Sequence, residues 1–289
     1  MSVDPHIDKE YDNRARVPEH PVHIARWQTD AQAYREETAA SGQSLLGLSY
    51  GPHERQAMDL FGPDARADQG GRGPILLFIH GGYWRGLDRS FFSHLAKGLN
   101  AHGVTVAIPS YRLCPAVGIQ DIIDDLRSAV RALYTRTRRP MAVAGHSAGG
   151  HLTACLLGTD WQAYDASLPD DLTTKGYSIS GLFDLLPMMQ TVMNADFKLD
   201  APEAKCVSPA LWTLPASVAS HLVMDAVVGG DESDEYFRQS ALIADVWGKQ
   251  GAKVSWSKHP DTNHFTILAP MSEPDSAMTA RLVELAQQA

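Results

Sequence analysis

The stretch Met141–Gly158, MAVAGHSAGGHLTACLLG, decides the fold of this chain of 289 residues. It opens with the apolar run Met141–Ala144, as a buried strand does, and it continues after Ser147 with residues of helical character. Between the two lies GHSAG (residues 145–149), which matches the pattern G-x-S-x-G. Glycines on both sides of the serine permit a turn sharp enough to leave its hydroxyl clear of the strand end. Ser147 is therefore the candidate nucleophile.

Strand-like and helix-like segments alternate on both sides of this turn. Apolar runs that indicate strands occur at Pro74–Ile79, Val104–Ile108, Tyr177–Ser180, Leu222–Val228 and Val254–Trp256. Segments with helical character occur at Ile119–Leu133, Tyr236–Gly251 and Asp275–Gln288. Such alternation implies an α/β fold, a mostly parallel sheet with helices on both faces. We expect a single domain over residues 1–289, with an N-terminal helical segment at 1–45 and a cap-like insertion at 182–220.

A second glycine motif, HGGYW at residues 80–84, follows the strand-like run Pro74–Ile79. Its glycines allow backbone N–H groups to point into a site beside the serine. We expect the amides of Gly82, Tyr83 and Ala148 to bind the oxyanion that forms when a serine attacks a carbonyl. The loss of one such donor typically lowers kcat by about 10²–10³.

Two aromatic residues near these motifs are candidates for contact with the substrate. They are Trp84, at the end of HGGYW, and Phe183, in SGLFD at residues 180–184. For Trp84, simple packing in the core is the alternative role.

A serine hydroxyl needs a base to remove its proton, and this chain has 12 histidines. His264 is favoured because it follows the last strand-like run, which gives the order serine, acid, histidine along the chain. His259 lies at the strand end and is the alternative. The acid should lie in the turn after the run Leu222–Val228, where it can orient the imidazole. Spacing does not separate the carboxylates that crowd there, which are Asp231, Glu232, Asp234 and Glu235.

Several motifs together resemble one family. HGGYW, GHSAGGHL (residues 145–152), SGLFD and ESDEYFRQS (residues 232–240) are similar to the kynurenine formamidase (arylformamidase) branch of the α/β-hydrolases. The opening YDNRARVP (residues 11–18) is similar to the same group, so the resemblance spans nearly the whole chain. It implies the α/β-hydrolase fold. It also implies an acid directly before the serine of D/E-S-x-E-F/Y, which selects Glu232. Many relatives carry Asp there, so Asp231 stays an alternative.

The same resemblance implies an aryl formamide such as N-formylkynurenine as the substrate, with release of formate. The same residues would hydrolyse small carboxylic esters. We therefore expect a serine hydrolase that acts on one of these bonds, with a broad short-chain carboxylesterase that has no role in kynurenine metabolism as the alternative. A hydrolase fold that only binds a ligand is an alternative of another class, and the presence of both Ser147 and His264 argues against it.

Composition limits the partners of this chain. A net charge of −9 argues against binding to nucleic acid or to an anionic membrane. The sequence contains no H-E-x-x-H, no paired cysteines and no G-x-G-x-x-G, so we expect neither a metal nor another cofactor. The opening MSVDPHIDKEYDNR lacks an apolar h-region, and no apolar run approaches the about 18 residues that span a bilayer. We expect a cytoplasmic protein with a small ester or amide as its partner, and the sequence leaves a homodimer open.

Overall fold

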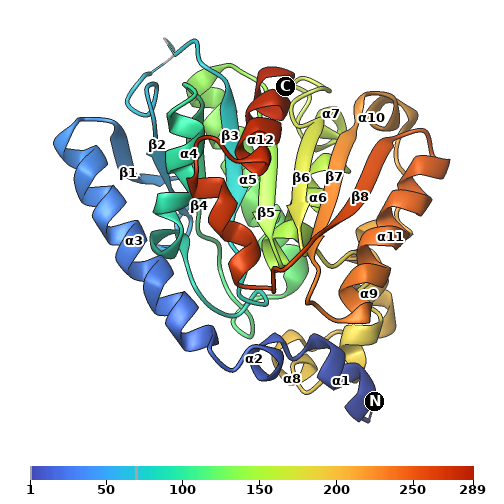
Figure 1. Ribbon diagram of the computed structural model, residues 1–289. Coiled ribbons are helices and arrows are strands. Elements are labelled where there is room, and N and C mark those ends of the chain that lie inside the picture. The colour runs from blue at the N-terminus through green and yellow to red at the C-terminus, as the bar shows by residue number, and fades with distance from the viewer. Residues whose placement is uncertain (1, 69–70) are drawn as a thin grey trace.

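The computed structural model describes residues 2–68 and 71–289. Its centre is an 8-stranded sheet with the strand order β1-β2-β4-β3-β5-β6-β7-β8 (Figure 1). The strands from β3 to β8 are parallel, whereas β2 is antiparallel to both β1 and β4. The mostly parallel sheet confirms the expectation from the sequence. The strands are β1 Ser44–Ser49, β2 Ala57–Phe61, β3 Ile75–Ile79, β4 Thr105–Pro109, β5 Ala142–His146, β6 Lys175–Ile179, β7 Val223–Gly229 and β8 Lys253–His259.

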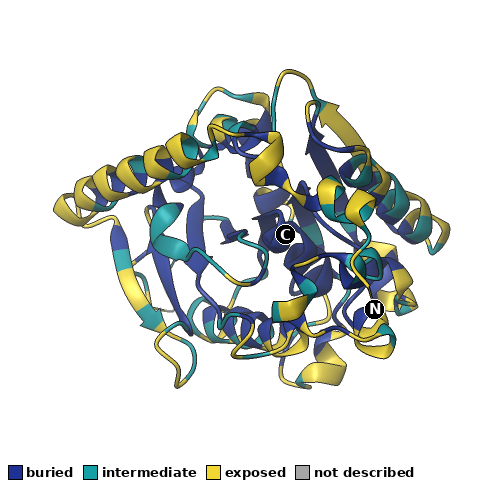
Figure 2. Ribbon diagram, turned by 90° about the horizontal axis from the view of Figure 1, so that it is seen from below, coloured by how far each residue is buried: buried dark blue, intermediate teal, exposed yellow. Residues whose placement is uncertain are grey.

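Helices cover both faces of the sheet, because successive residues of a strand point to opposite sides. Leu76 and Phe78 of β3 pack into the core beneath α3, α4 and α12. Leu77 and Ile79 of the same strand pack into the core beneath α5 and α6, and α11 covers β7 on that face. Figure 2 shows the central strands buried, whereas most of β8, much of β1 and the outer faces of the helices are exposed. These helices are α3 His20–Ala40, α4 Ala96–Asn100, α5 Ile119–Thr137, α6 Ala148–Leu157, α11 Asp234–Lys249 and α12 Ala277–Gln287.

Shorter helices connect these elements. The α-helices among them are α1 Pro5–Tyr11, α2 Asn13–Arg16, α7 Trp161–Tyr164, α8 Asn194–Phe197, α9 Ala201–Cys206 and α10 Ala216–His221. The 3₁₀ helices are η1 Arg89–Phe91, η2 Ser93–Leu95, η3 Pro187–Gln190, η4 Pro209–Leu211 and η5 Thr266–Ser272. Within the described ranges, no helix has both the length and the apolar character needed to cross a membrane.

The segment 182–220, expected as a cap-like insertion, contains only short helices and meets the N-terminal helices. The N–H of Asp4 donates to the Gln190 carbonyl at 2.8 Å, and the N–H of Val192 donates to Asp8 Oδ1 at 2.8 Å. Helices α1, α2 and α8 thus gather at one end of the sheet (Figure 1). Two segments that are far apart in the sequence therefore lie together there.

The first two strands were not expected from the sequence. The helical part of the N-terminal segment ends at Ala40, and the segment 1–45 therefore already includes the start of β1. In β1, Gly47 has φ +72° and the register with β2 shifts, so the usual alternation of buried and exposed residues is broken. In β2, Asp59 is fully buried between Arg35, at 2.6 Å, and Arg89, at 3.1 Å. A carboxylate in the middle of a strand of five residues interrupts the apolar run that indicates a strand. The arginines that pair with it come from other segments of the chain.

Candidate active site

Ser147 lies at the turn between β5 and α6 with φ 57° and ψ −119°, a conformation that residues other than glycine rarely adopt. The turn requires the flanking glycines. A Cβ on Gly145 would come within 2.2 Å of the Gly149 carbonyl oxygen, and a Cβ on Gly149 would come within 2.0 Å of the Ile79 carbonyl oxygen. The N–H of Ser147 donates to the Ile179 carbonyl at 2.8 Å, which ties the turn to β6. The strained conformation is therefore fixed by neighbours on both sides.

His264 and Glu232 form a buried pair near this turn. His264 follows β8, and its Nδ1 lies 2.6 Å from Glu232 Oε2. The second carboxylate oxygen of Glu232, Oε1, accepts hydrogen bonds from Ser180 Oγ at 2.5 Å and from the Gly229 N–H at 2.8 Å. Asp231, the alternative acid, is exposed. The structure thus brings Glu232, and not Asp231, to His264.

His146, the residue before the serine, holds the loop of His264. Its Nε2–H donates to the His264 carbonyl oxygen at 2.9 Å, and the centroids of the two rings lie 4.6 Å apart. Burial, together with the neighbouring His264, lowers the pKa of His146 well below its ordinary value. His146 therefore stays neutral and acts as a donor to this loop. His259, the alternative base, ends β8 and is not among the residues that line the cavity described below.

The HGGYW loop lies directly against the turn. A Cβ on Gly81 would come within 2.8 Å of the His146 carbonyl oxygen, and Gly82 has φ +112°. Among the described residues, the N–H groups of Gly82 and Tyr83 donate to no other protein group. Ala148, the third expected donor, is the first residue of α6. The loop therefore leaves backbone donors free beside the serine.

A cavity of about 600 Å³ lies in front of the serine, a volume in the range of small-molecule sites. Trp27 and Phe265 form an aromatic wall, with ring centroids 5.8 Å apart. Over residues 2–68 and 71–289, no three His, Cys, Asp or Glu side chains gather as a metal site would need. The lining includes Asp8, Tyr11, Asp12, Asn13, Arg14, Trp27, Gly82, Tyr83, Arg85, Cys114, His146, Ser147, Val192, Met193, Asp196, His264 and Phe265.

A row of hydrogen bonds connects the N-terminal helices to this site. Asn13 Nδ2 donates to the Tyr236 hydroxyl at 2.7 Å, and that hydroxyl lies 2.7 Å from the Tyr83 hydroxyl. The Tyr83 hydroxyl donates to the Tyr11 carbonyl oxygen at 2.6 Å. Burial raises the pKa of both Tyr83 and Tyr236 above the ordinary value, so both phenols keep their protons. Asn13 and Tyr236 were not among the site residues predicted from the sequence. Their place within YDNRARVP and ESDEYFRQS was the one indication available.

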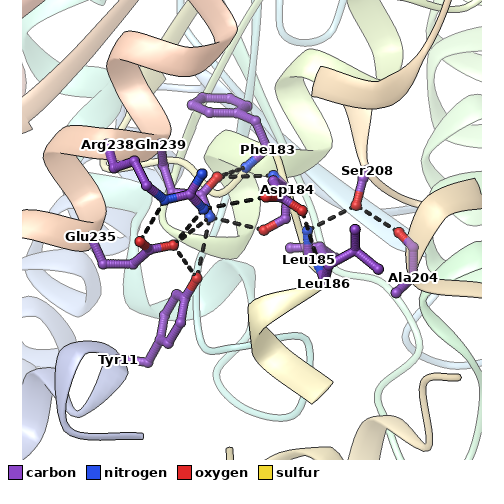
Figure 3. Close-up of polar contacts among 10 residues, drawn as sticks. All are labelled: Tyr11, Phe183, Asp184, Leu185, Leu186, Ala204, Ser208, Glu235, Arg238 and Gln239. Atoms are coloured by element: carbon purple, nitrogen blue, oxygen red, sulfur yellow. Dashed lines mark hydrogen bonds and ion pairs between the residues drawn. The ribbon is translucent and has the colours of Figure 1, made fainter. Parts of the chain in front are cut away.

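Tyr11 attaches these N-terminal helices to α11. Figure 3 shows its hydroxyl pointing toward Glu235 and Gln239. The hydroxyl donates to Glu235 Oε1 at 2.5 Å and accepts from Gln239 Nε2 at 3.2 Å. Gln239 Oε1 in turn accepts from the Phe183 N–H at 2.7 Å. One glutamine therefore links α1 and the start of the segment 182–220 to α11.

The assignment of Trp84 and Phe183 to substrate contact has to be corrected, because both are fully buried and neither lines the cavity. Trp84 Nε1 donates to His151 Nδ1 at 3.3 Å, so its polar edge is already paired inside the protein. Phe183 belongs to the core between α6 and α11. Their apolar surface is used in packing, and the aromatic residues that line the cavity include Trp27, Phe265, Tyr11 and Tyr83.

Residues 76–268 match a family model described as the alpha/beta hydrolase fold. The chain is an α/β-hydrolase. This α/β-hydrolase is 28% identical to the kynurenine formamidase of Danio rerio over 91% of this chain and 88% of that protein. It is 28% identical to the kynurenine formamidase of Salmo salar over 86% of this chain and 84% of that protein. A crystal structure described as a putative thioesterase from Silicibacter sp. TM1040 is 32% identical, with a TM-score of 0.81 over 96% of this chain and 98% of that chain.

Proposed function

We propose that this α/β-hydrolase cleaves a small carboxylic ester or an aryl formamide by acyl transfer to Ser147. The observation that carries the proposal is the buried pair of Glu232 and His264, 2.6 Å apart, beside a serine that lines the same cavity as His264. A carboxylate that accepts the Nδ1–H of a histidine fixes the tautomer of the ring. His264 Nε2 is then free to take the proton of the serine.

The reaction proceeds in two steps. His264 takes the proton of Ser147 as its Oγ attacks the carbonyl carbon, and Glu232 stabilises the resulting imidazolium. The oxyanion accepts hydrogen bonds from the amides of the HGGYW loop and of Ala148. His264 then protonates the leaving nitrogen or oxygen, and the bond between that atom and the carbonyl carbon breaks. Water, activated by His264, attacks the acyl-serine and releases the carboxylic acid together with the free serine.

Features of the cavity favour an aryl formamide. Trp27 and Phe265, which stack on each other, supply aromatic surface to the cavity lining that an aryl group can contact. Arg14 and Asp12 add charges of both signs to the lining, which suits the zwitterionic amino-acid tail of N-formylkynurenine. The two kynurenine formamidases are similar to this chain over more than four-fifths of their own length. N-formylkynurenine is therefore the first substrate to test.

A short-chain ester or thioester is the second candidate. Its support is the Silicibacter structure, which is described as a putative thioesterase and resembles this chain in both sequence and fold. The chemistry is the same, because only the leaving atom differs.

The test compares kcat/KM for N-formylkynurenine and for 4-nitrophenyl acetate. We expect hydrolysis of both, a ratio in favour of the formamide, and loss of both activities in Ser147→Ala. A ratio strongly in favour of the ester would remove the formamidase assignment. If Ser147→Ala kept most of its activity, the nucleophile would be wrong.

A further inference from the structure

The Tyr83 hydroxyl, in the HGGYW loop, is held by three partners. It donates its single proton to the Tyr11 carbonyl oxygen at 2.6 Å. Because that proton is used, the contact of 2.7 Å with the Tyr236 hydroxyl requires Tyr236 to be the donor. Asn13 Nδ2 donates to the same Tyr83 hydroxyl at 3.1 Å. A phenol has one proton and two lone pairs, so every hydrogen-bonding position of this hydroxyl is filled.

These three partners belong to elements that are themselves fixed. Tyr11 ends α1, Asn13 begins α2 and Tyr236 lies in α11. All three residues are at most 3% exposed. The hydroxyl of Tyr11 is bonded in turn to two side chains of α11, as Figure 3 shows. The Tyr83 hydroxyl is therefore anchored to buried groups that are held by further hydrogen bonds.

The backbone of Tyr83 needs such an anchor. Its φ is 50°, in the left-handed region that residues other than glycine rarely adopt, and Gly82 and Trp84 on either side also have positive φ. Over residues 2–68 and 71–289, neither the N–H nor the carbonyl oxygen of Tyr83 pairs with another backbone group. The next carbonyl oxygen, that of Trp84, accepts from the Cys114 N–H at 2.9 Å. The fixed polar contacts of Tyr83 itself are therefore those of its hydroxyl.

The HGGYW loop lies against the nucleophile, because a Cβ on Gly81 would come within 3.0 Å of Ser147 Cβ. We propose that the Tyr83 hydroxyl is a positioning group, which through its bonds to Tyr11 and Tyr236 holds the backbone N–H of Tyr83 in place for the oxyanion. The inference rests on the proposed function, in which this N–H is one of the oxyanion donors. Such donors lower the barrier because they are oriented before the charge forms, so a donor that has to be reoriented contributes less.

Removal of this anchor should affect the transition state and not the bound substrate. The oxyanion forms only as the serine or water attacks the carbonyl carbon, so the loss should lower kcat and leave KM nearly unchanged. Both steps of the acyl transfer pass through an oxyanion, and both should slow together. Tyr83→Phe deletes the hydroxyl and keeps the ring, so the aromatic surface that Tyr83 gives to the cavity is preserved.

The test measures Tyr83→Phe with 4-nitrophenyl acetate and with 2,2,2-trifluoroacetophenone, a ketone that a serine attacks to give a stable tetrahedral oxyanion. We expect kcat to fall about tenfold with KM changed by less than about twofold, and the Ki of the ketone to rise by about the factor that kcat loses. Tyr34→Phe is the matched control. Tyr34 is also buried and its hydroxyl donates to Asn100 Oδ1 at 2.6 Å, but it does not line the cavity. This control should leave kcat and Ki near the wild-type values.

Wild-type values of kcat and Ki in Tyr83→Phe would overturn this inference alone, provided that Ser147→Ala is inactive. An equal fall of kcat in Tyr34→Phe would do the same, because the loss would then be that of any buried hydroxyl. A change confined to KM, with Ki unaltered, would place the role of Tyr83 in substrate binding and would also overturn the inference. An active Ser147→Ala would overturn the proposed function as well.

A second variant keeps the inference testable if Tyr83→Phe does not fold. Tyr236→Phe removes one donor to the Tyr83 hydroxyl and leaves its bond to the Tyr11 carbonyl oxygen. We expect it to lower kcat and raise the Ki of the ketone by a common factor that is smaller than in Tyr83→Phe. A Ki that stayed at the wild-type value in Tyr236→Phe would overturn the inference.

Discussion

His264 Nδ1 lies 2.6 Å from Glu232 Oε2, and the other oxygen of the same carboxylate is held by Ser180 Oγ and the Gly229 N–H. Both carboxylate oxygens are thus fixed by the protein. Because the carboxylate cannot turn, the imidazole that donates to it is held in one orientation and one tautomer. In the proposed mechanism, proton transfer by His264 therefore depends on Ser180, directly after β6, and on Gly229 of β7, neither of which lines the cavity.

Glu232→Gln should lower kcat for 4-nitrophenyl acetate by about 10³–10⁴, because an amide at this place no longer selects the tautomer that the base needs. Asp231→Asn is the control, since the side chain of Asp231 is exposed and should leave the rate near that of the wild type. Steady-state kinetics of the two variants would decide which carboxylate is the acid. An equal loss in Asp231→Asn would contradict the assignment of Glu232.

Ser180→Ala should lower kcat about tenfold, because the variant loses one of the two donors that hold Glu232 Oε1. Ser178→Ala is a matched control. Ser178 is also a buried serine of this region, but its hydroxyl donates to the Gly150 carbonyl at 3.0 Å and not to Glu232. The ratio of the two kcat values, measured on one substrate, is the readout. If both variants lost activity equally, the loss would reflect packing around β6 rather than the position of the carboxylate.

Gly149→Ala should lower the free energy of unfolding by about 2 kcal/mol or more, because its Cβ would meet the Ile79 backbone at 2.0 Å. Gly248→Ala should instead raise the free energy of unfolding by about 0.5 kcal/mol. An added Cβ there has open space, and alanine favours the helical backbone of α11. Urea unfolding of both variants measures the two values. A neutral Gly149→Ala would show that the turn can relax.

Stability should fall as the pH falls below about 6.5. Burial lowers the pKa of His80 and of His151 to about 4, and burial with His264 nearby lowers that of His146 well below its ordinary value. These rings stay neutral in the folded protein, whereas in the unfolded chain they bind protons near pH 6.5. The stabilisation is therefore complete above pH 6.5 and is lost progressively toward pH 4, by about 1 kcal/mol or more per pH unit. Urea unfolding at pH 7.5, 6.0 and 5.0 measures this slope, and equal stability at all three values would contradict it.

Asp59→Asn should destabilise the fold by about 3 kcal/mol, because Arg35 and Arg89 would both lose their buried partner. Asp245→Asn removes the partner of Lys249 in an exposed pair and should change stability by less than about 1 kcal/mol. Thermal unfolding of the two variants provides the comparison. A small effect of Asp59→Asn would mean that the two arginines find other acceptors or water.

The turn at Ser147 could be predicted from the sequence because its determinants are local. Gly145 and Gly149 each lie two residues from Ser147. A Cβ on Gly145 would collide with Gly149, and a Cβ on Gly149 would collide with the neighbouring strand β3. The choice of Glu232 over Asp231 could not be made from spacing. Burial separates the two carboxylates, and burial depends on how β7 and α11 meet.

The parts that could not be predicted depend on contacts between distant segments. The pairing of Asp59 with two arginines involves α3 and η1. The place of Asn13 beside Tyr236 requires that the first helices fold back onto α11. The prediction that Trp84 contacts the substrate was wrong for a related reason. Its partners His151 and Phe197 lie on helices that the sequence does not show to be adjacent.

Asn13 and His264 line one cavity, although they lie near opposite ends of the printed sequence. A ribosome must therefore release the chain to beyond His264 before the site can form, and a product truncated between Ser147 and His264 would lack the proposed base. The same geometry guides protein engineering. An affinity tag placed before α1 would lie beside a helix whose Asp8 and Tyr11 line the cavity, whereas a tag after α12 would project from the opposite end of the sheet (Figure 1).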